Sequence, residues 1–85
     1  MTATELLDQA ATLEPVIFDR QAPARVRIEA AAAWFDNLAA ARALDPQNAR
    51  LSTPTAGKVG AVLVNRWAPG VNLDAPLPEW INQTN

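Results

Sequence analysis

The chain has 85 residues, a net charge of −2 and an apolar fraction of 49%, with no cysteine and no histidine. The lack of cysteine excludes disulfides and thiolate chemistry, and the lack of histidine removes the commonest metal ligand and general base. A chain of this length forms a single domain with a modest core, so that association with a partner would add stability.

The first expected element is a helix over residues 3–14. Thr2 and Glu5 have the spacing of a capping box, in which each side chain accepts a hydrogen bond from the other's backbone N–H. Pro15 marks the expected end, because the residue before a proline is disfavoured in the α region. We expect the apolar residues 16–18 to pack over the core as a short extended connector.

The longest helical pattern spans residues 23–44. Pro23 suits the first turn of a helix, where its missing N–H has no intrahelical partner to lose. Apolar residues recur at the spacing of one helical face: Ala24, Ile28, Ala31, Phe35 and Leu38, widened by Trp34 and Ala41. This pattern predicts a central helix with Trp34 in the core, and its alanines permit other elements to approach closely.

A third helix is expected over residues 54–67. Thr53 and Pro54 match an N-cap followed by a first-turn proline. Four apolar residues then fall on one face: Ala56, Val59, Leu63 and Trp67. Gly57 and Gly60 would each weaken a helix by about 1 kcal/mol, and the neighbouring valines also suit a buried strand. The cap favours the helix, in which both glycines would mark close packing against the preceding helix.

The last segment, residues 69–85, is an apolar tail interrupted by proline. Pro69, Pro76 and Pro78 exclude a regular helix, because proline lacks the backbone N–H and clashes with the preceding turn. Apolar residues occupy alternate positions: Val71, Leu73, Ala75 and Leu77. Alternation of this kind is typical of an extended segment with one apolar face. The sequence leaves open whether this arm packs on its own chain or on another molecule.

Together these elements predict a small all-α domain, with a three-helix body over residues 1–68 and an extended, proline-rich C-terminal arm. Charge is segregated along the chain: residues 1–19 hold four carboxylates and no cation, residues 20–66 hold all seven cations and three carboxylates, and residues 67–85 hold two carboxylates. Acidic ends around a basic middle predict that the ends fold back onto the middle, of this chain or of a neighbouring copy.

The sequence has no pattern for catalysis, a metal or a cofactor. Gly57 and Lys58 lack the upstream glycine and the following Ser or Thr of a phosphate loop, and Ser52 has no histidine with which to form a triad. We therefore expect no catalytic, metal-ligating or cofactor-binding residue. There is no signal-peptide pattern, and no apolar run reaches the ~20 residues of a membrane span, so we expect a cytoplasmic protein or a component of an assembled particle.

The favoured hypothesis is a non-enzymatic accessory or assembly protein that binds another protein or copies of itself, as an inhibitor, a modulator or a virion component. The arm would dock in a groove or beside a sheet edge, as extended peptides do. The predicted partner-binding residues are Trp67, Val71, Leu73, Leu77, Trp80 and Ile81. The alternative is a small nucleic-acid-binding regulator that contacts phosphates through Arg20, Arg25, Arg27 and Arg50.

Overall fold

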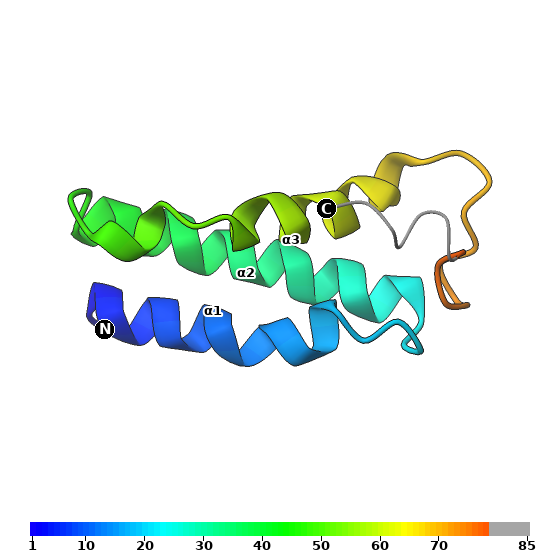
Figure 1. Cartoon of the computed structure of the whole chain (residues 1–85), viewed down its shortest axis with the longest axis horizontal. Coiled ribbons are helices and arrows are strands. Elements are labelled where there is room, and N and C mark those ends of the chain that lie inside the picture. Colours follow the sequence, from blue (N-terminus) through cyan, green and yellow to red (C-terminus); the bar gives the residue numbers. More distant parts are fainter. Residues whose placement is uncertain (79–85) are drawn as a thin grey trace.

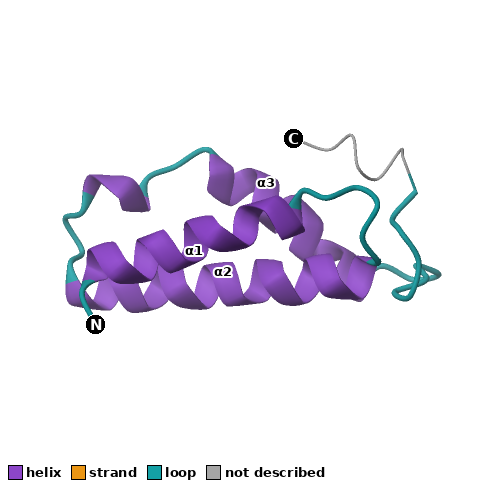
Figure 2. Cartoon of the chain, turned by 90° about the horizontal axis from the view of Figure 1, so that it is seen from below, coloured by secondary structure: helices purple, strands orange, loops and turns teal. Residues whose placement is uncertain are grey.

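The computed structural model describes residues 1–78 of the chain. It contains the helices α1 (Ala3–Ile17), α2 (Ala24–Leu44) and α3 (Thr55–Leu63), and the 3₁₀ turns η1 (Ala49–Leu51) and η2 (Val64–Trp67). No strand occurs in residues 1–78, which confirms the all-α, three-helix prediction and the choice of a helix rather than a strand after Thr53 (Figure 2).

The central element is α2. The first helix, α1, runs antiparallel to α2 along most of its length, and α3 returns across a different side of α2 (Figure 1). The capping box at Thr2 and Glu5 is present, with hydrogen bonds of 3.0 and 3.1 Å, and it begins α1 where the sequence predicts. Because both other helices pack on α2, its apolar face has to be wide, and the alanine-rich sequence provides this width.

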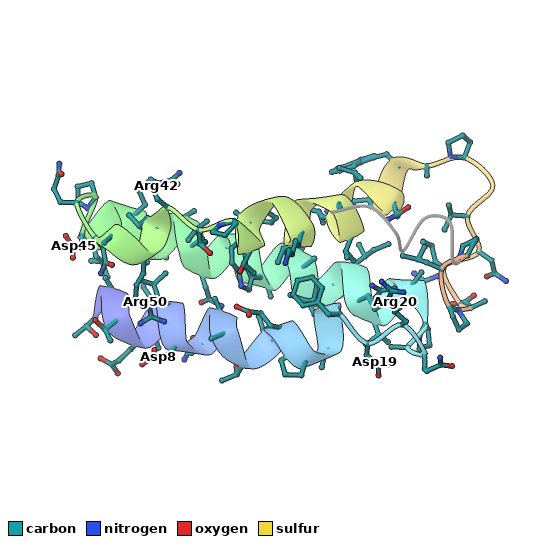
Figure 3. The ribbon with its side chains drawn as sticks, in the orientation of Figure 1. Asp8, Asp19, Arg20, Arg42, Asp45 and Arg50 are labelled. Atoms are coloured by element: carbon teal, nitrogen blue, oxygen red, sulfur yellow. The ribbon has the colours of Figure 1, made fainter. Side chains whose placement is uncertain are left out.

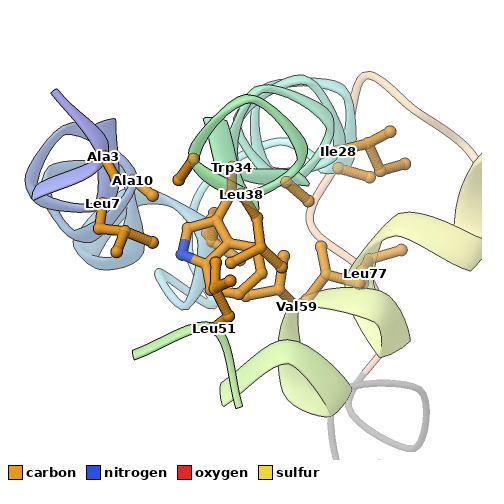
Figure 4. Close-up of a cluster of buried hydrophobic side chains, with 14 residues drawn as sticks. Ala3, Leu7, Ala10, Ile28, Trp34, Leu38, Leu51, Val59 and Leu77 are labelled. Atoms are coloured by element: carbon orange, nitrogen blue, oxygen red, sulfur yellow. The ribbon is translucent and has the colours of Figure 1, made fainter. Parts of the chain in front are cut away.

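The predicted apolar face of α2 forms the core. Trp34 is 3% exposed, and its ring meets Phe35 edge-on with the two centroids 5.0 Å apart. Its indole N–H donates to the Glu14 carboxylate of α1 at 3.2 Å. Side chains from the surrounding layers meet beside Trp34 (Figure 4): Leu7 of α1, Leu51 of η1 and Val59 of α3. The prediction that Trp34 lies in the core is confirmed.

The helix α1 continues through Pro15 to Ile17, so the predicted end at Glu14 and the predicted extended connector over residues 16–18 are wrong. Pro15 removes one backbone N–H, yet the Phe18 N–H still bonds the Glu14 carbonyl at 3.0 Å and closes the last turn. The added turn buries Ile17 completely, which contributes about 1.5–3 kcal/mol. This packing offsets much of the roughly 3 kcal/mol that proline costs inside a helix.

A buried arginine of α2 completes the C-terminal end of α1. Arg27 is 3% exposed, and its Nε donates to the Ile17 carbonyl at 2.8 Å. The last carbonyls of a helix lack intrahelical partners and carry partial negative charge, and α1 has no basic residue in its own last turn. Burial and the nearby charge of Arg20 lower the pKa of Arg27, whereas Asp19 raises it, and the guanidinium stays charged. The neighbouring helix thus supplies the cap that α1 lacks.

Replacing Arg27 with methionine keeps an apolar stem but removes the donor to Ile17. We expect Arg27→Met to lower the free energy of unfolding by about 1.5–3 kcal/mol, the range for hydrogen bonds to charged groups. Urea unfolding followed by circular dichroism measures the loss. The matched control is Arg25→Met, which removes an exposed ion pair and should cost about 1 kcal/mol or less. Equal losses for the two variants would contradict the capping role.

The glycines of α3 have different surroundings. A Cβ at Gly60 would lie 3.7 Å from Phe35 of α2, so this position faces the central helix as predicted. A Cβ at Gly57 would meet nothing within 4 Å, so the predicted close packing there is wrong. Gly57 is exposed and its φ is not positive. It therefore weakens α3 without a packing benefit.

We expect Gly57→Ala to raise the free energy of unfolding by about 0.5–1 kcal/mol, because alanine is the better helix former and has fewer unfolded conformations. Urea and thermal unfolding measure the gain. Gly70 is the control, since its φ of 80° lies in the left-handed region and alanine there should be destabilising. A Gly57→Ala variant no more stable than the parent would show that this prediction is wrong.

The described part of the arm folds back onto the start of α2. The Ala24 N–H donates to the Ala75 carbonyl at 2.9 Å, and the Arg25 N–H donates to the Leu73 carbonyl at 2.7 Å. Since α2 has no side-chain N-cap, the arm carbonyls satisfy N–H groups that a helix leaves unpaired at its start. The described arm is thus a cap for α2 within its own chain.

Burial along the arm follows the predicted alternation. Val71, Leu73 and Ala75 are half-buried and Leu77 is 5% exposed, whereas Asn72, Asp74, Pro76 and Pro78 are exposed. Exposed ion pairs join Asp74 to Arg25 at 3.2 Å and Asp8 to Arg50 at 3.0 Å. The acidic ends therefore fold onto the basic middle of the same chain. Residues 73–75 form a turn, with the Ala75 N–H bonded to the Asn72 carbonyl at 3.4 Å, so the predicted extended form is interrupted there. Residues 79–85 lie outside the described residues, and their extended form stays a prediction.

Because Leu77 is 5% exposed, Leu77→Ala should lower the free energy of unfolding by about 2–5 kcal/mol. The control is Leu44→Ala: this leucine at the end of α2 is 59% exposed, and its loss should change stability by about 0.5 kcal/mol or less. Urea unfolding of both variants measures the difference. Equal stability of the two would mean that the arm does not dock on its own body.

Candidate protein interaction surface

The predicted partner-binding residues separate into distinct groups in the structure. Leu77 is buried, and Val71 and Leu73 pack against the core, so these side chains stabilise their own chain. Trp67 is 68% exposed. The remaining two, Trp80 and Ile81, lie outside the described residues. Within residues 1–78, Trp67 is therefore the most exposed of the predicted contact residues.

Trp67 is exposed because of the way α3 ends. The α-helix stops at Leu63, and the chain continues through the four residues of η2 as a 3₁₀ turn. An α-helix advances about 100° per residue and a 3₁₀ helix about 120°, so η2 turns Trp67 roughly 80° away from the face that the sequence predicts. The helix expected over residues 54–67 therefore ends as a 3₁₀ turn, and Trp67 does not share the helical face of Val59 and Leu63.

The side chain of Asn65 stabilises this helix end. Asn65 is 6% exposed, and its Nδ2 donates to the Ala61 and Val62 carbonyls at 2.9 and 3.1 Å. These carbonyls belong to the last turn of α3, where no further α-helical N–H reaches them. An asparagine side chain that bonds backbone carbonyls three and four residues earlier competes with continuation of the α-helix. Asn65 thus helps to set the direction in which Trp67 projects.

The residues Val64, Arg66 and Trp67 form an exposed group that we call the η2 patch. Val64 is 58% exposed, and the Arg66 guanidinium lies 5.7 Å from the centroid of the Trp67 ring. This distance is within the range of a cation–π interaction, which favours one orientation of the ring at the surface. Tryptophan and arginine are the residues most enriched at the energetic centres of protein interfaces.

A hollow of about 400 Å³ adjoins the η2 patch, inside the loop that leads into the arm, and we call it the arm hollow. Its lining consists of Ala68, Pro69, Gly70, Val71, Asn72, Pro76 and Pro78. All of these except Asn72 are apolar or glycine. Gly70 has a φ of 80°, which allows the chain to turn back here. Ala68, the first residue of the lining, directly follows Trp67, so the hollow begins one residue after the η2 patch.

The arginines predicted to contact nucleic acid do not form one patch. Arg20 and Arg50 lie at opposite ends of the body (Figure 3). Arg25 and Arg50 are each engaged by a carboxylate of this chain. Arg27 is buried at the end of α1, so the prediction that it is a surface phosphate contact is wrong. Its side chain is occupied by a structural bond instead.

A second hollow, of about 300 Å³, lies between α1 and the chain from η1 to α3, with Trp34 and Leu38 of α2 in its lining. Its polar lining comes from Glu14, Arg50 and the hydroxyls that surround the start of α3. The described residues hold no group of three or more Asp, Glu, Cys or His side chains that could bind a metal ion. No described helix has both the length and the apolar character needed to cross a membrane.

Comparison of the chain with protein-family models, with curated proteins and with solved structures finds no match. The surface described above is therefore the basis for assigning a function. Among its features, the η2 patch and the adjoining arm hollow are the ones that combine exposed apolar area with a defined shape.

Sequence reasoning missed several residues of this surface and of its support. Arg27 had a usable signal, because it lies at helical spacing with Ala31, Trp34 and Leu38 on the buried face of α2. The position of Arg27 on this helical face by itself indicates that its side chain points towards the core. The exposure of Val64 and the pairing of Arg66 with the Trp67 ring had no comparable signal, because both depend on the switch from an α-helix to a 3₁₀ turn.

Proposed function

We propose that this chain is a non-enzymatic accessory or assembly protein that acts by binding protein through the η2 patch. The single observation that carries the proposal is the 68% exposure of Trp67 beside a stacked arginine. In a chain with a modest core, a tryptophan left outside loses a large stabilising contribution, since an aromatic side chain can bury about 150–250 Å². A partner that covers this ring recovers that contribution.

The arm has a different part in this proposal from the one that the sequence suggests. Its apolar residues Leu73 and Leu77 support the proposal as a scaffold, because they anchor the arm on the body. The neighbouring arm residues Val71, Pro76 and Pro78 line the arm hollow. The partner then contacts a preformed surface rather than a mobile peptide, which reduces the ordering cost of binding. Partners of this kind include a protein that the chain modulates or inhibits, and neighbouring subunits of a larger particle.

The test compares matched variants in affinity capture from the native source. Trp67→Ala should reduce the recovery of bound protein at least about tenfold, because a central tryptophan typically contributes 2 kcal/mol or more to binding. Leu44→Ala removes a leucine of similar exposure, 59%, at the last residue of α2, and should leave recovery unchanged. This end of α2 and η2 lie at opposite ends of the body (Figure 1). Circular dichroism should show the same helicity for both variants. Unchanged capture by Trp67→Ala would remove the basis of the proposal.

A further inference from the structure

The η2 patch and the arm hollow have the shapes of a knob and a hole. We propose that their partner is a second copy of this chain, with Trp67 of each copy inserted into the arm hollow of the other. This inference rests on the proposed function, because it names the partner of the same surface. It commits to a symmetric dimer, in which both insertions occur at once.

The arm hollow is large enough to hold the Trp67 side chain of a second copy. The hollow measures about 400 Å³ and is lined by apolar side chains, among them Pro69, Val71 and Pro76. Pockets of about 300–1,000 Å³ hold drug-sized ligands, so a hollow of this size can take an indole side chain. Trp67 projects 68% of its surface outside its own chain and is oriented by Arg66. Within residues 1–78, it is the exposed aromatic side chain closest in sequence to the hollow, since the next residue, Ala68, belongs to the lining.

The adjacency of knob and hole is what allows two copies to pair symmetrically. In a two-fold interface the same patch of surface is used by both subunits, so a residue and its contact site have to lie within one patch. Trp67 immediately precedes Ala68, the first residue of the hollow lining, so the knob and the hole are one residue apart in the chain and lie at the same end of the body. Had the hollow been at the far end of α2, docking would give open chains of copies rather than closed pairs.

Charge favours the same arrangement. The knob carries the cation Arg66, whereas residues 68–78 carry Asp74 and no cation. The Asp74 side chain is 79% exposed, even though one oxygen pairs with Arg25 of its own chain. Reciprocal insertion brings the positive knob of each copy towards the acidic arm of the other. Such complementarity affects partner choice and association rate more than affinity.

The size of the surface predicts a weak dimer. Stable interfaces bury about 1,200–2,000 Å² in total, and a patch centred on one tryptophan per copy is smaller than a standard interface half. We therefore expect association that depends on protein concentration. Multi-angle light scattering and sedimentation velocity, from roughly 1 µM to 1 mM, cover the range in which such interfaces dissociate. The average mass should rise with concentration from 9.1 kDa towards twice that value.

Three variants separate the contributions of the Trp67 side chain and of the arm hollow to dimer formation. Trp67→Ala removes the knob, and Ala68→Phe places a ring in the hollow and blocks it; each should weaken the dimer at least roughly thirtyfold. Leu44→Ala should dimerise like the parent chain. Mixing Trp67→Ala with Ala68→Phe restores one insertion, since the first keeps an open hollow and the second keeps the knob. The mixture should therefore associate more strongly than either variant alone, while circular dichroism confirms that each is folded.

Several outcomes would overturn the inference. One is a mass that stays at 9.1 kDa over the whole concentration range. Another is a dimer that Trp67→Ala leaves intact, or one that the mixture of variants fails to restore. If the chain stays monomeric and Trp67→Ala still abolishes capture of a different protein, the second copy is the wrong partner but the proposed function stands. If neither dimer nor capture depends on Trp67, both proposals fail.

Discussion

The structure depends on hydrogen bonds between different elements at one corner of the fold, where α1 ends, α2 begins and the arm returns. Arg27 of α2 bonds the Ile17 carbonyl, and the first N–H groups of α2 bond the carbonyls of Leu73 and Ala75. Backbone groups at helix ends that are buried without partners cost free energy, and neither helix end has a suitable side chain in its own segment. Each element at this corner therefore completes its neighbour.

This constraint determines which apolar residues a partner can reach. The arm is held on α2 by its carbonyls and by the buried side chain of Leu77, so most of its apolar face belongs to the core. Among the predicted contact residues that the structure describes, Trp67 of the η2 patch stays exposed, because the 3₁₀ turn after α3 directs it outward. The arm then frames a hollow beside Trp67 instead of acting as the docking peptide itself. The proposed function follows from this division between covered and exposed apolar residues.

The sequence identified Trp67 and Arg27 by their chemistry but did not give the direction in which either side chain points. Trp67 was predicted as a partner contact because of its chemistry, but its assumed helical phase aligned it with Val59 and Leu63, and the 3₁₀ turn directs it elsewhere. Arg27 was recognised as a cation near the start of a helix, but its structural partner, the Ile17 carbonyl, lies ten residues earlier in a helix that the proline rule ends too soon. Both errors arise because local rules place a residue relative to its own segment, whereas burial depends on the segments packed against it.

The sequence by itself determined the three-helix class, the capping box at Thr2, the central position of Trp34 and the alternating burial of the arm between Val71 and Pro78. These follow from periodicity and from short-range side-chain bonds, which act within a few residues. Only the tertiary structure decided that α1 runs through Pro15, that the described arm caps α2 of its own chain, and that Trp67 faces outward. Those outcomes depend on contacts between residues far apart in the chain, where packing free energy outweighs the local preference of a proline or the phase of a single helix.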